Sequence, residues 1–128
     1  MSVGQFVFML HSHLPYYRKA GMWPFGEENL YECMAETYIP LLNAISELYD
    51  EGIKAKLTVG ITPILAEQLN DQHLKEGFVK YVDSRIAQVS KDLERYPDPE
   101  VPHSQHLKYL AKYYFDWFTN IKNSFINK

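Results

Sequence analysis

Two short apolar segments on either side of an amphipathic stretch constrain the fold of this chain most strongly. Residues 5–10 are almost continuously apolar, which is typical of a strand buried on both faces of a parallel sheet. Residues 54–61 alternate between apolar and polar or small side chains and predict a second strand. A strand, a crossover helix and a second strand form a βαβ unit, which is parallel and almost always right-handed. The chain is therefore predicted to belong to the α/β class.

Apolar residues at helical spacing predict four helices. The crossover helix is expected over residues 27–49, with a kink at Pro40 and an end at Gly52. Three more helices follow the second strand, and the residues expected to cap them are Thr62, Asp71 and Ser104. The helix after Asp71 is expected to end near the Pro97-Asp98-Pro99 turn, and the aromatic stripe of the last helix to be core.

Four helices are many for a sheet of two strands. A two-stranded parallel sheet with apolar faces leaves both edges and much apolar surface uncovered. We therefore expect further strands outside residues 1–128, and interpret residues 1–128 as the N-terminal part of a larger domain. The same exposed surface predicts that the isolated chain associates with itself.

Composition and charge exclude several classes of protein. The net charge is −3 with both signs interspersed, so no basic surface for nucleic acid is expected. The apolar start is too short for a membrane span, and we expect a cytoplasmic protein. The single cysteine, Cys33, cannot form an internal disulfide and is interpreted as a buried packing residue. Aromatic residues make up 15% of the chain, and such rings pack in cores and also stack on sugars.

His11 and His13 are the strongest candidate site residues. They follow the first predicted strand, and side chains two apart on an extended backbone point to the same side. Binding sites of parallel α/β folds lie at the carboxyl ends of the strands. From the residues alone, the pair could bind a metal such as zinc, recognise a substrate through hydrogen bonds, or be structural.

Several segments, in order, resemble the start of glycoside hydrolase family 57, and in particular its α-1,4-glucan branching enzymes. They include His11-Ser12-His13-Leu14-Pro15-Tyr16, the loop through Trp23, Ala35 to Leu42 and Thr62 to Leu69. The resemblance implies part of a (β/α)7 barrel and a retaining reaction that cleaves an α-1,4 bond and forms an α-1,6 bond. It also implies that the Glu nucleophile and the Asp acid/base lie outside this chain, so that the chain alone is inactive. No cofactor or metal is implied.

The resemblance assigns His11, His13 and Trp23 to the binding of an α-glucan such as glycogen or amylose. His11 would hydrogen-bond a sugar hydroxyl or the nucleophile, His13 would contact substrate or orient His11, and Trp23 would stack on a glucose ring. The alternatives are a family 57 α-amylase or 4-α-glucanotransferase, a metal-dependent hydrolase, and a noncatalytic carbohydrate-binding module. The expected partners are the glucan and the remainder of the barrel, with no nucleic acid or membrane.

The remaining ionisable residues are given structural roles. Glu27 and Glu28 are adjacent on a helix, so their side chains diverge by about 100° and cannot flank one bond. We assign both to the helix N-terminus, where negative charge is favoured. Three other histidines are expected to be solvated or to cap helices, namely His73, His103 and His106.

Overall fold

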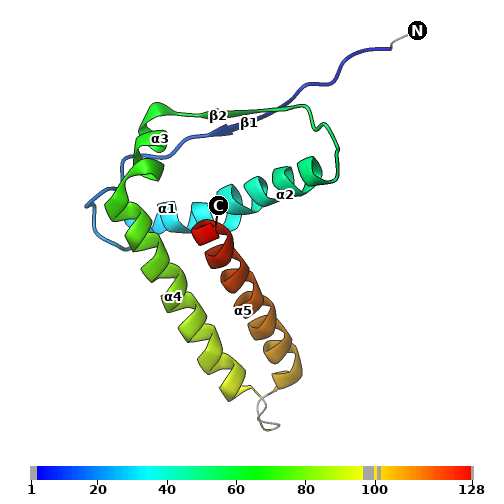
Figure 1. Cartoon of the computed structure of the whole chain (residues 1–128). Helices are drawn as coiled ribbons and strands as arrows, with labels where there is room; N and C mark the ends of the chain where they lie inside the picture. The colour runs from blue at the N-terminus through cyan, green and yellow to red at the C-terminus, as the bar shows by residue number, and fades with distance from the viewer. Residues whose placement is uncertain (1–2, 97–99, 101, 128) are drawn as a thin grey trace.

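The computed structural model describes residues 3–96, 100 and 102–127. Two parallel strands and four helical segments follow one another along the chain (Figure 1), so the α/β prediction is confirmed. The first long helix has three parts, α1, η1 and α2, because a π-helical turn interrupts it. The elements are β1 (Phe8–Ser12), α1 (Glu27–Cys33), η1 (Met34–Tyr38), α2 (Ile39–Asp50), β2 (Leu57–Ile61), α3 (Pro63–Asn70), α4 (Gln72–Arg95) and α5 (Ser104–Asn127).

The two strands pair in parallel, as the βαβ prediction requires. The register runs from Phe8 opposite Leu57 to Ser12 opposite Ile61, and the Thr62 amide donates to the Ser12 carbonyl at 3.3 Å. Strand β1 begins at Phe8, later than predicted from the apolar run. In the part of the chain that the structure describes, β1 pairs with β2 alone, and Phe8 and Met9, on opposite faces of the strand, keep 48% and 69% of their surface exposed. The expectation that this strand is buried on both faces is therefore wrong for these residues.

The helix between the strands is continuous from Glu27 to Asp50, but its irregular turn precedes Pro40 instead of lying at it. The Ile39 amide donates to the Met34 carbonyl five residues back, which is the hydrogen bond of a π-helix. Proline has no N–H to donate to the carbonyl four residues before it. The wider turn therefore accommodates the break in the α-helical pattern just before the ring.

Gly52 ends this helix as predicted. Its φ of 76° lies in the left-handed region that glycine adopts without steric cost. Its amide donates to the Tyr49 carbonyl at 3.0 Å, and the next amide, of Ile53, donates to Leu48 at 2.8 Å. These two bonds form a Schellman motif, which satisfies carbonyls at the end of α2 before the chain turns back towards β2.

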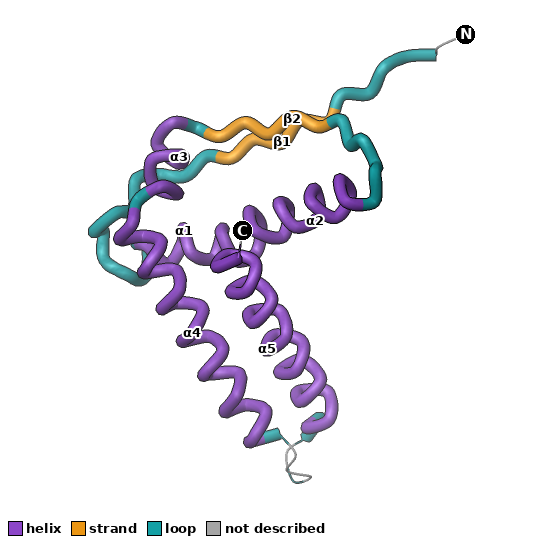
Figure 2. The backbone as a smooth tube through the Cα atoms, in the orientation of Figure 1, coloured by secondary structure: helices purple, strands orange, loops and turns teal. Residues whose placement is uncertain are grey.

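The hydrophobic core lies among the helices and not around the sheet. Helices α4 and α5 form a long hairpin that leads away from the strands, and its base packs against α1 and α2 (Figure 2). The largest fully buried side chains come from α1, α3 and α4 and include Leu30, Tyr31, Leu65, Leu74 and Phe78. Phe78 packs edge-on against Phe125 with ring centroids 4.8 Å apart, which joins α4 to α5.

The predicted caps have mixed outcomes. Asp71 caps α4 as expected, since its carboxylate accepts from the Leu74 amide at 3.1 Å. Thr62 precedes α3, but its hydroxyl makes no capping bond and is buried without a partner, so that expectation is wrong. Helix α5 begins at Ser104 itself, one residue earlier than a Ser104 cap implies. The turn expected at Pro97-Asp98-Pro99 lies outside the described residues.

The aromatic stripe of α5 is only partly core. Ile121 is buried and Trp117 and Phe118 pack against the core cluster, but Tyr114 keeps 48% of its surface exposed. The helix packs against α4 and α2, so the sheet is not its main neighbour. Within the described residues, no helix combines the length and hydrophobicity that crossing a bilayer requires.

Candidate substrate-binding site

His11 lies at the carboxyl end of β1, on the face of the sheet that points away from α2. Its register partner on β2 is Gly60. A Cβ atom placed on Gly60 would lie 3.1 Å from His11 Nδ1, so the missing side chain leaves room for the imidazole over the neighbouring strand. The His11 side chain is exposed. The predicted position of this histidine at the strand ends is therefore what the structure shows.

His13 and Trp23 are both exposed in the long loop between β1 and α1. Trp23 keeps 78% of its surface exposed and precedes a cis peptide bond to Pro24. In the part of the chain that the structure describes, no hydrogen bond or ring contact joins His11, His13 and Trp23 to one another. The structure thus places all three at or after the end of β1 but does not bring their side chains into contact.

The opposite face of the sheet carries a separate apolar hollow. It has a volume of about 310 Å³ and is lined on the strand side by Ser12, Val59 and Ile61 and on the helix side by Tyr38 and Leu41, among others. Neighbouring residues of a strand alternate between faces, so His11 cannot share this lining. The hollow is mostly apolar, although Ser12 and Tyr38 contribute hydroxyl groups to its lining.

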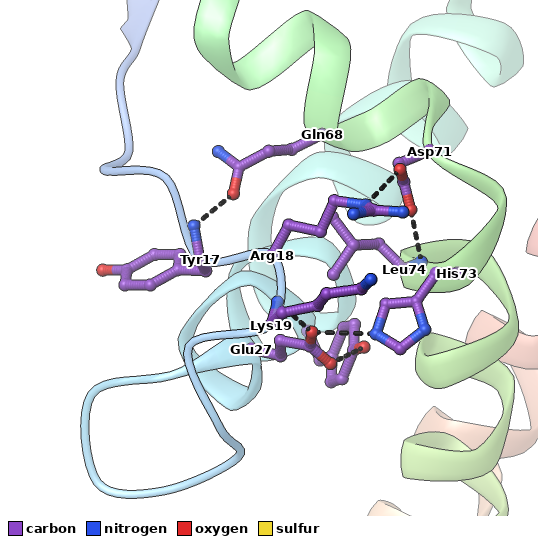
Figure 3. Close-up of polar contacts among 9 residues, drawn as sticks. Tyr17, Arg18, Lys19, Glu27, Gln68, Asp71, His73 and Leu74 are labelled. Carbon is purple, nitrogen blue, oxygen red and sulfur yellow. Dashed lines mark hydrogen bonds and ion pairs between the residues drawn. The ribbon is translucent and has the colours of Figure 1, made fainter.

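A buried amide holds the first part of the loop (Figure 3). Gln68 on α3 is only 1% exposed, and its Oε1 accepts from the Tyr17 backbone N–H at 2.6 Å. Its Nε2 donates to the Pro15 carbonyl at 2.9 Å. A buried amide group is stable only when it is hydrogen-bonded, and here both of its ends are. The backbone on either side of Tyr16 is therefore tied to α3.

An ion pair holds the next residue of the loop. Arg18 Nε donates to Asp71 Oδ2 at 2.6 Å, and this hydrogen bond raises the pKa of the guanidinium. Burial alone would raise the pKa of Asp71, but hydrogen bonds from the Leu74 amide and from Arg18 outweigh it and lower the pKa. Asp71 thus caps α4 and anchors the loop with the same carboxylate.

Glu27 is the third anchor of the loop, and its carboxylate has three partners (Figure 3). The Lys19 amide donates to Oε1 at 2.7 Å, His73 Nε2 lies 2.9 Å from the same oxygen, and the Tyr31 hydroxyl donates to Oε2 at 3.0 Å. Burial favours the neutral acid, yet these bonds prevail and lower the pKa of Glu27. Burial and the neighbouring carboxylate also raise the pKa of Tyr31.

These contacts refine two predictions made from the sequence. Glu27 does begin α1, as expected, but its side chain is buried and holds the loop instead of only favouring the helix end. His73 lies in the first turn of α4 and is exposed to solvent as expected, but its ring also pairs with Glu27. Cys33 is half-buried, and burial raises the pKa of its thiol.

The loop anchors were missed because the contacts of Gln68, Asp71 and His73 join them to residues 46 to 53 positions away in the sequence. Two glycines did mark, in the sequence, positions where the chain packs closely around the loop. Gly77 interrupts the pattern of α4, and a Cβ atom there would overlap the Tyr31 hydroxyl that binds Glu27. Gly26 is buried, and a Cβ atom there would overlap the Gly21 carbonyl. Both positions therefore need glycine for close packing of the loop and its anchors.

The arrangement is suited to binding more than to bond cleavage by itself. It presents the His11 imidazole at the end of β1, and the His13 imidazole and Trp23 indole on the following loop, whose backbone is held at Pro15, Tyr17 and Lys19. The carboxylates of Glu27 and Asp71 are occupied by structural partners. Among residues 3–96, 100 and 102–127, no three His, Cys, Asp or Glu side chains group together as metal ligands would.

Known proteins resemble this chain over nearly its whole length. It is 41% identical over 125 residues to the 1,4-alpha-glucan branching enzyme of Thermococcus kodakarensis, a match that covers 98% of this chain and 18% of that protein. The crystal structure of the GH57-type branching enzyme of Pyrococcus horikoshii superposes with a TM-score of 0.86 at 38% identity, covering 94% of this chain and 22% of that chain. The α-amylase AmyC of Thermotoga maritima gives a TM-score of 0.78 at 33% identity and the same 94% coverage of this chain.

The chain thus spans about a fifth of the length of these relatives. Its two parallel strands and four helices match the N-terminal region of the branching-enzyme structures. The family model described as glycosyl hydrolase family 57 matches residues 7–127, which is nearly all of the chain. The chain belongs to glycosyl hydrolase family 57.

Proposed function

We propose that this chain forms one wall of the active site of a 1,4-α-glucan branching enzyme, within the first part of its catalytic barrel. The observation that carries the proposal is the position of His11 over Gly60, at the carboxyl ends of two adjacent parallel strands. Substrates of barrel enzymes bind at that end. The similar enzyme of Thermococcus kodakaraensis was crystallised in complex with glucose, which supports a sugar ligand.

Each site residue has a distinct role in this proposal. The His11 imidazole donates and accepts hydrogen bonds, so it holds a hydroxyl of the sugar under attack or orients the nucleophile. His13 contacts substrate or steadies His11. The exposed Trp23 indole stacks on the apolar face of a glucose ring further along the glucan.

The bond-making step needs two carboxylates that other segments would supply. In a retaining reaction one attacks the anomeric carbon and the other protonates the leaving oxygen, and the two stand roughly 5 Å apart. Transfer of the covalently held chain to a 6-hydroxyl then forms the α-1,6 branch. The present chain would bind and orient the glucan and hold the loop against α3 and α4.

A single cysteine is compatible with the reducing cytoplasm, where we propose that the enzyme acts.

The test is a chimaera in which residues 1–128 replace the matching segment of the Thermococcus kodakarensis enzyme. We expect the chimaera to form α-1,6 branches on amylose. His11→Ala should lower kcat/KM about 100-fold, the usual effect of removing one positioned hydrogen-bonding group from a transition state. Trp23→Ala should act mainly by raising KM, because stacking binds the ground state and the transition state alike.

Matched controls separate site effects from surface effects. His106→Ala and Tyr49→Ala remove an exposed histidine and an exposed tyrosine outside the loop, and both should leave kcat/KM unchanged. A chimaera with native melting behaviour but no activity would overturn the proposal. Equal effects of His11→Ala and His106→Ala would also overturn it.

An α-amylase is the second candidate, favoured by the likeness to the Thermotoga maritima enzyme. The same histidines and tryptophan would bind the glucan, but water would accept the cleaved chain. Reducing ends that accumulate without new α-1,6 linkages would identify this outcome in the chimaera.

A further inference from the structure

Gln68 is an unusual choice for its position if packing alone is considered. Helix α3 buries Leu65 and Gln68 on one face, and Gln68 is 1% exposed. A leucine or methionine there would fill the space without the cost of desolvating an amide. What only the amide offers is a donor and an acceptor side by side, and both are used on the loop backbone, at Pro15 and Tyr17.

These two bonds fix the residue between them. Tyr16 has its backbone tied on both sides, yet its side chain is 60% exposed. Arg18, two residues further along, is held by Asp71. A tyrosine whose backbone is restrained on both sides loses less freedom on binding a ligand, so contact of its ring with a sugar would be favourable.

We propose that Gln68 is a positioning residue that holds the backbone of Tyr16 in place. Tyr16, three residues after His13 in the loop, is then a further side chain that contacts the glucan. The Tyr16 ring offers an apolar face to a glucose unit, and its hydroxyl can bond a sugar hydroxyl. Gln68 itself touches no substrate. The ligand in this inference rests on the proposed function, whereas the restraint of the loop does not.

The first test measures the restraint in the 128-residue chain without any sugar. Gln68→Met keeps the shape of the side chain and removes both bonds. Amide hydrogen exchange at Tyr17 should become about tenfold faster, the factor expected for loss of one hydrogen bond of typical net strength. Exchange at Phe78 in the core should not change, and Gln88→Met, at an exposed position of α4, should change neither amide. Unaltered exchange at the Tyr17 amide, or equal acceleration at the Phe78 amide, would overturn the inference that Gln68 restrains the loop.

The second test asks whether the two hydrogen bonds of Gln68 to the loop contribute to glucan binding in the chimaera. Gln68→Met and Tyr16→Ala should each raise KM for amylose about fivefold, with kcat within twofold, and the double variant should be no worse than Tyr16→Ala, because one change acts through the other. A lower kcat at constant KM would indicate a merely structural role and overturn the inference. An inactive parent chimaera would refute the proposed function and the sugar ligand together. The exchange data would still decide whether Gln68 restrains the loop.

Discussion

Large apolar side chains are buried at several positions on the helices of this chain but are at least partly exposed on its strands. On the helices, Leu65 and Phe78 are completely shielded from water. On the strands, Met9 keeps 69% of its surface exposed and Ile61 keeps 51%. All four side chains are large and apolar, so residue type alone does not decide burial. A helix needs one stripe covered, and its neighbours along this chain cover it, whereas a strand in a barrel needs neighbours at both edges and on both faces.

Polar side chains show the same contrast in reverse. Glu27 and Gln68 lie among the helices with almost no exposed surface, and in each side chain both polar terminal atoms are hydrogen-bonded. His11 and His13 lie at the strand end and face solvent. These two anchors of the loop are therefore buried, while the candidate ligand-binding histidines are not. The helices supply the anchors of the loop in the candidate site.

The largest expected effect tests where the stability of the chain resides. Phe78→Ala should lower the free energy of unfolding by about 3–5 kcal/mol, because it removes a buried ring and leaves a cavity. Phe6→Ala, the matched change at a ring that is 90% exposed before β1, should cost less than about 0.5 kcal/mol. Urea denaturation followed by circular dichroism measures both.

If Phe78→Ala does not fold, Phe78→Leu offers a milder change of the same kind, for which we expect a loss of about 1–2 kcal/mol. Similar losses for Phe78→Leu and Phe6→Ala would contradict the contrast between helices and strands.

A smaller effect with a diagnostic sign is expected at Gly77. Replacing a helical glycine with alanine ordinarily stabilises a protein by about 0.5–1 kcal/mol. Here the new Cβ would overlap the Tyr31 hydroxyl, so we expect Gly77→Ala to destabilise the chain by about 1–3 kcal/mol. Thermal melts compared at one pH give the difference.

Two controls accompany this change. Ser84→Ala places an alanine at an exposed position of the same helix and should have little effect. In the Tyr31→Phe background, which lacks the obstructing oxygen, Gly77→Ala should cost less. A Gly77→Ala chain more stable than the parent would show that Tyr31 is not held where the loop anchor requires it.

The smallest expected effect concerns the pH dependence of the loop anchor. The pKa of Glu27 is lowered in the folded chain from its ordinary value of 4.5, so its carboxylate stabilises the fold fully above that value. This contribution is lost as the pH falls below about 4.5 and through the folded-state pKa. Glu27→Gln should therefore lower stability by roughly 1 kcal/mol at pH 7 and by progressively less below pH 4.5.

Urea midpoints measured from pH 7 to pH 3 give this profile, and Glu94→Gln, at an exposed position of α4, should follow the parent at every pH. A constant difference between Glu27→Gln and the parent across that range would mean that the charge of Glu27 does not bear on the loop.

Local sequence signals predicted the order and type of the elements, because they depend on neighbours a few residues apart. The apolar run, the alternating segment, Gly52 after α2 and Asp71 before α4 each had the expected local consequence. Thr62 did not, since its hydroxyl is buried without a partner although its sequence context favours a cap. The π-turn before Pro40 was not predicted either, although the missing N–H of that proline gives it a local cause.

For the candidate site, sequence determined which residues are available and roughly where they lie. The position of His11 at a strand end follows from the length of an apolar run and from the rule that parallel strands share one carboxyl edge. The anchoring of the loop depended on the tertiary structure. Gln68, Asp71 and His73 lie 46 to 53 residues along the chain from their partners, which are in the loop or at the start of α1. Such pairings arise only when separate helices pack together and exclude water from the polar groups between them, and no local pattern of residues specifies which groups will meet.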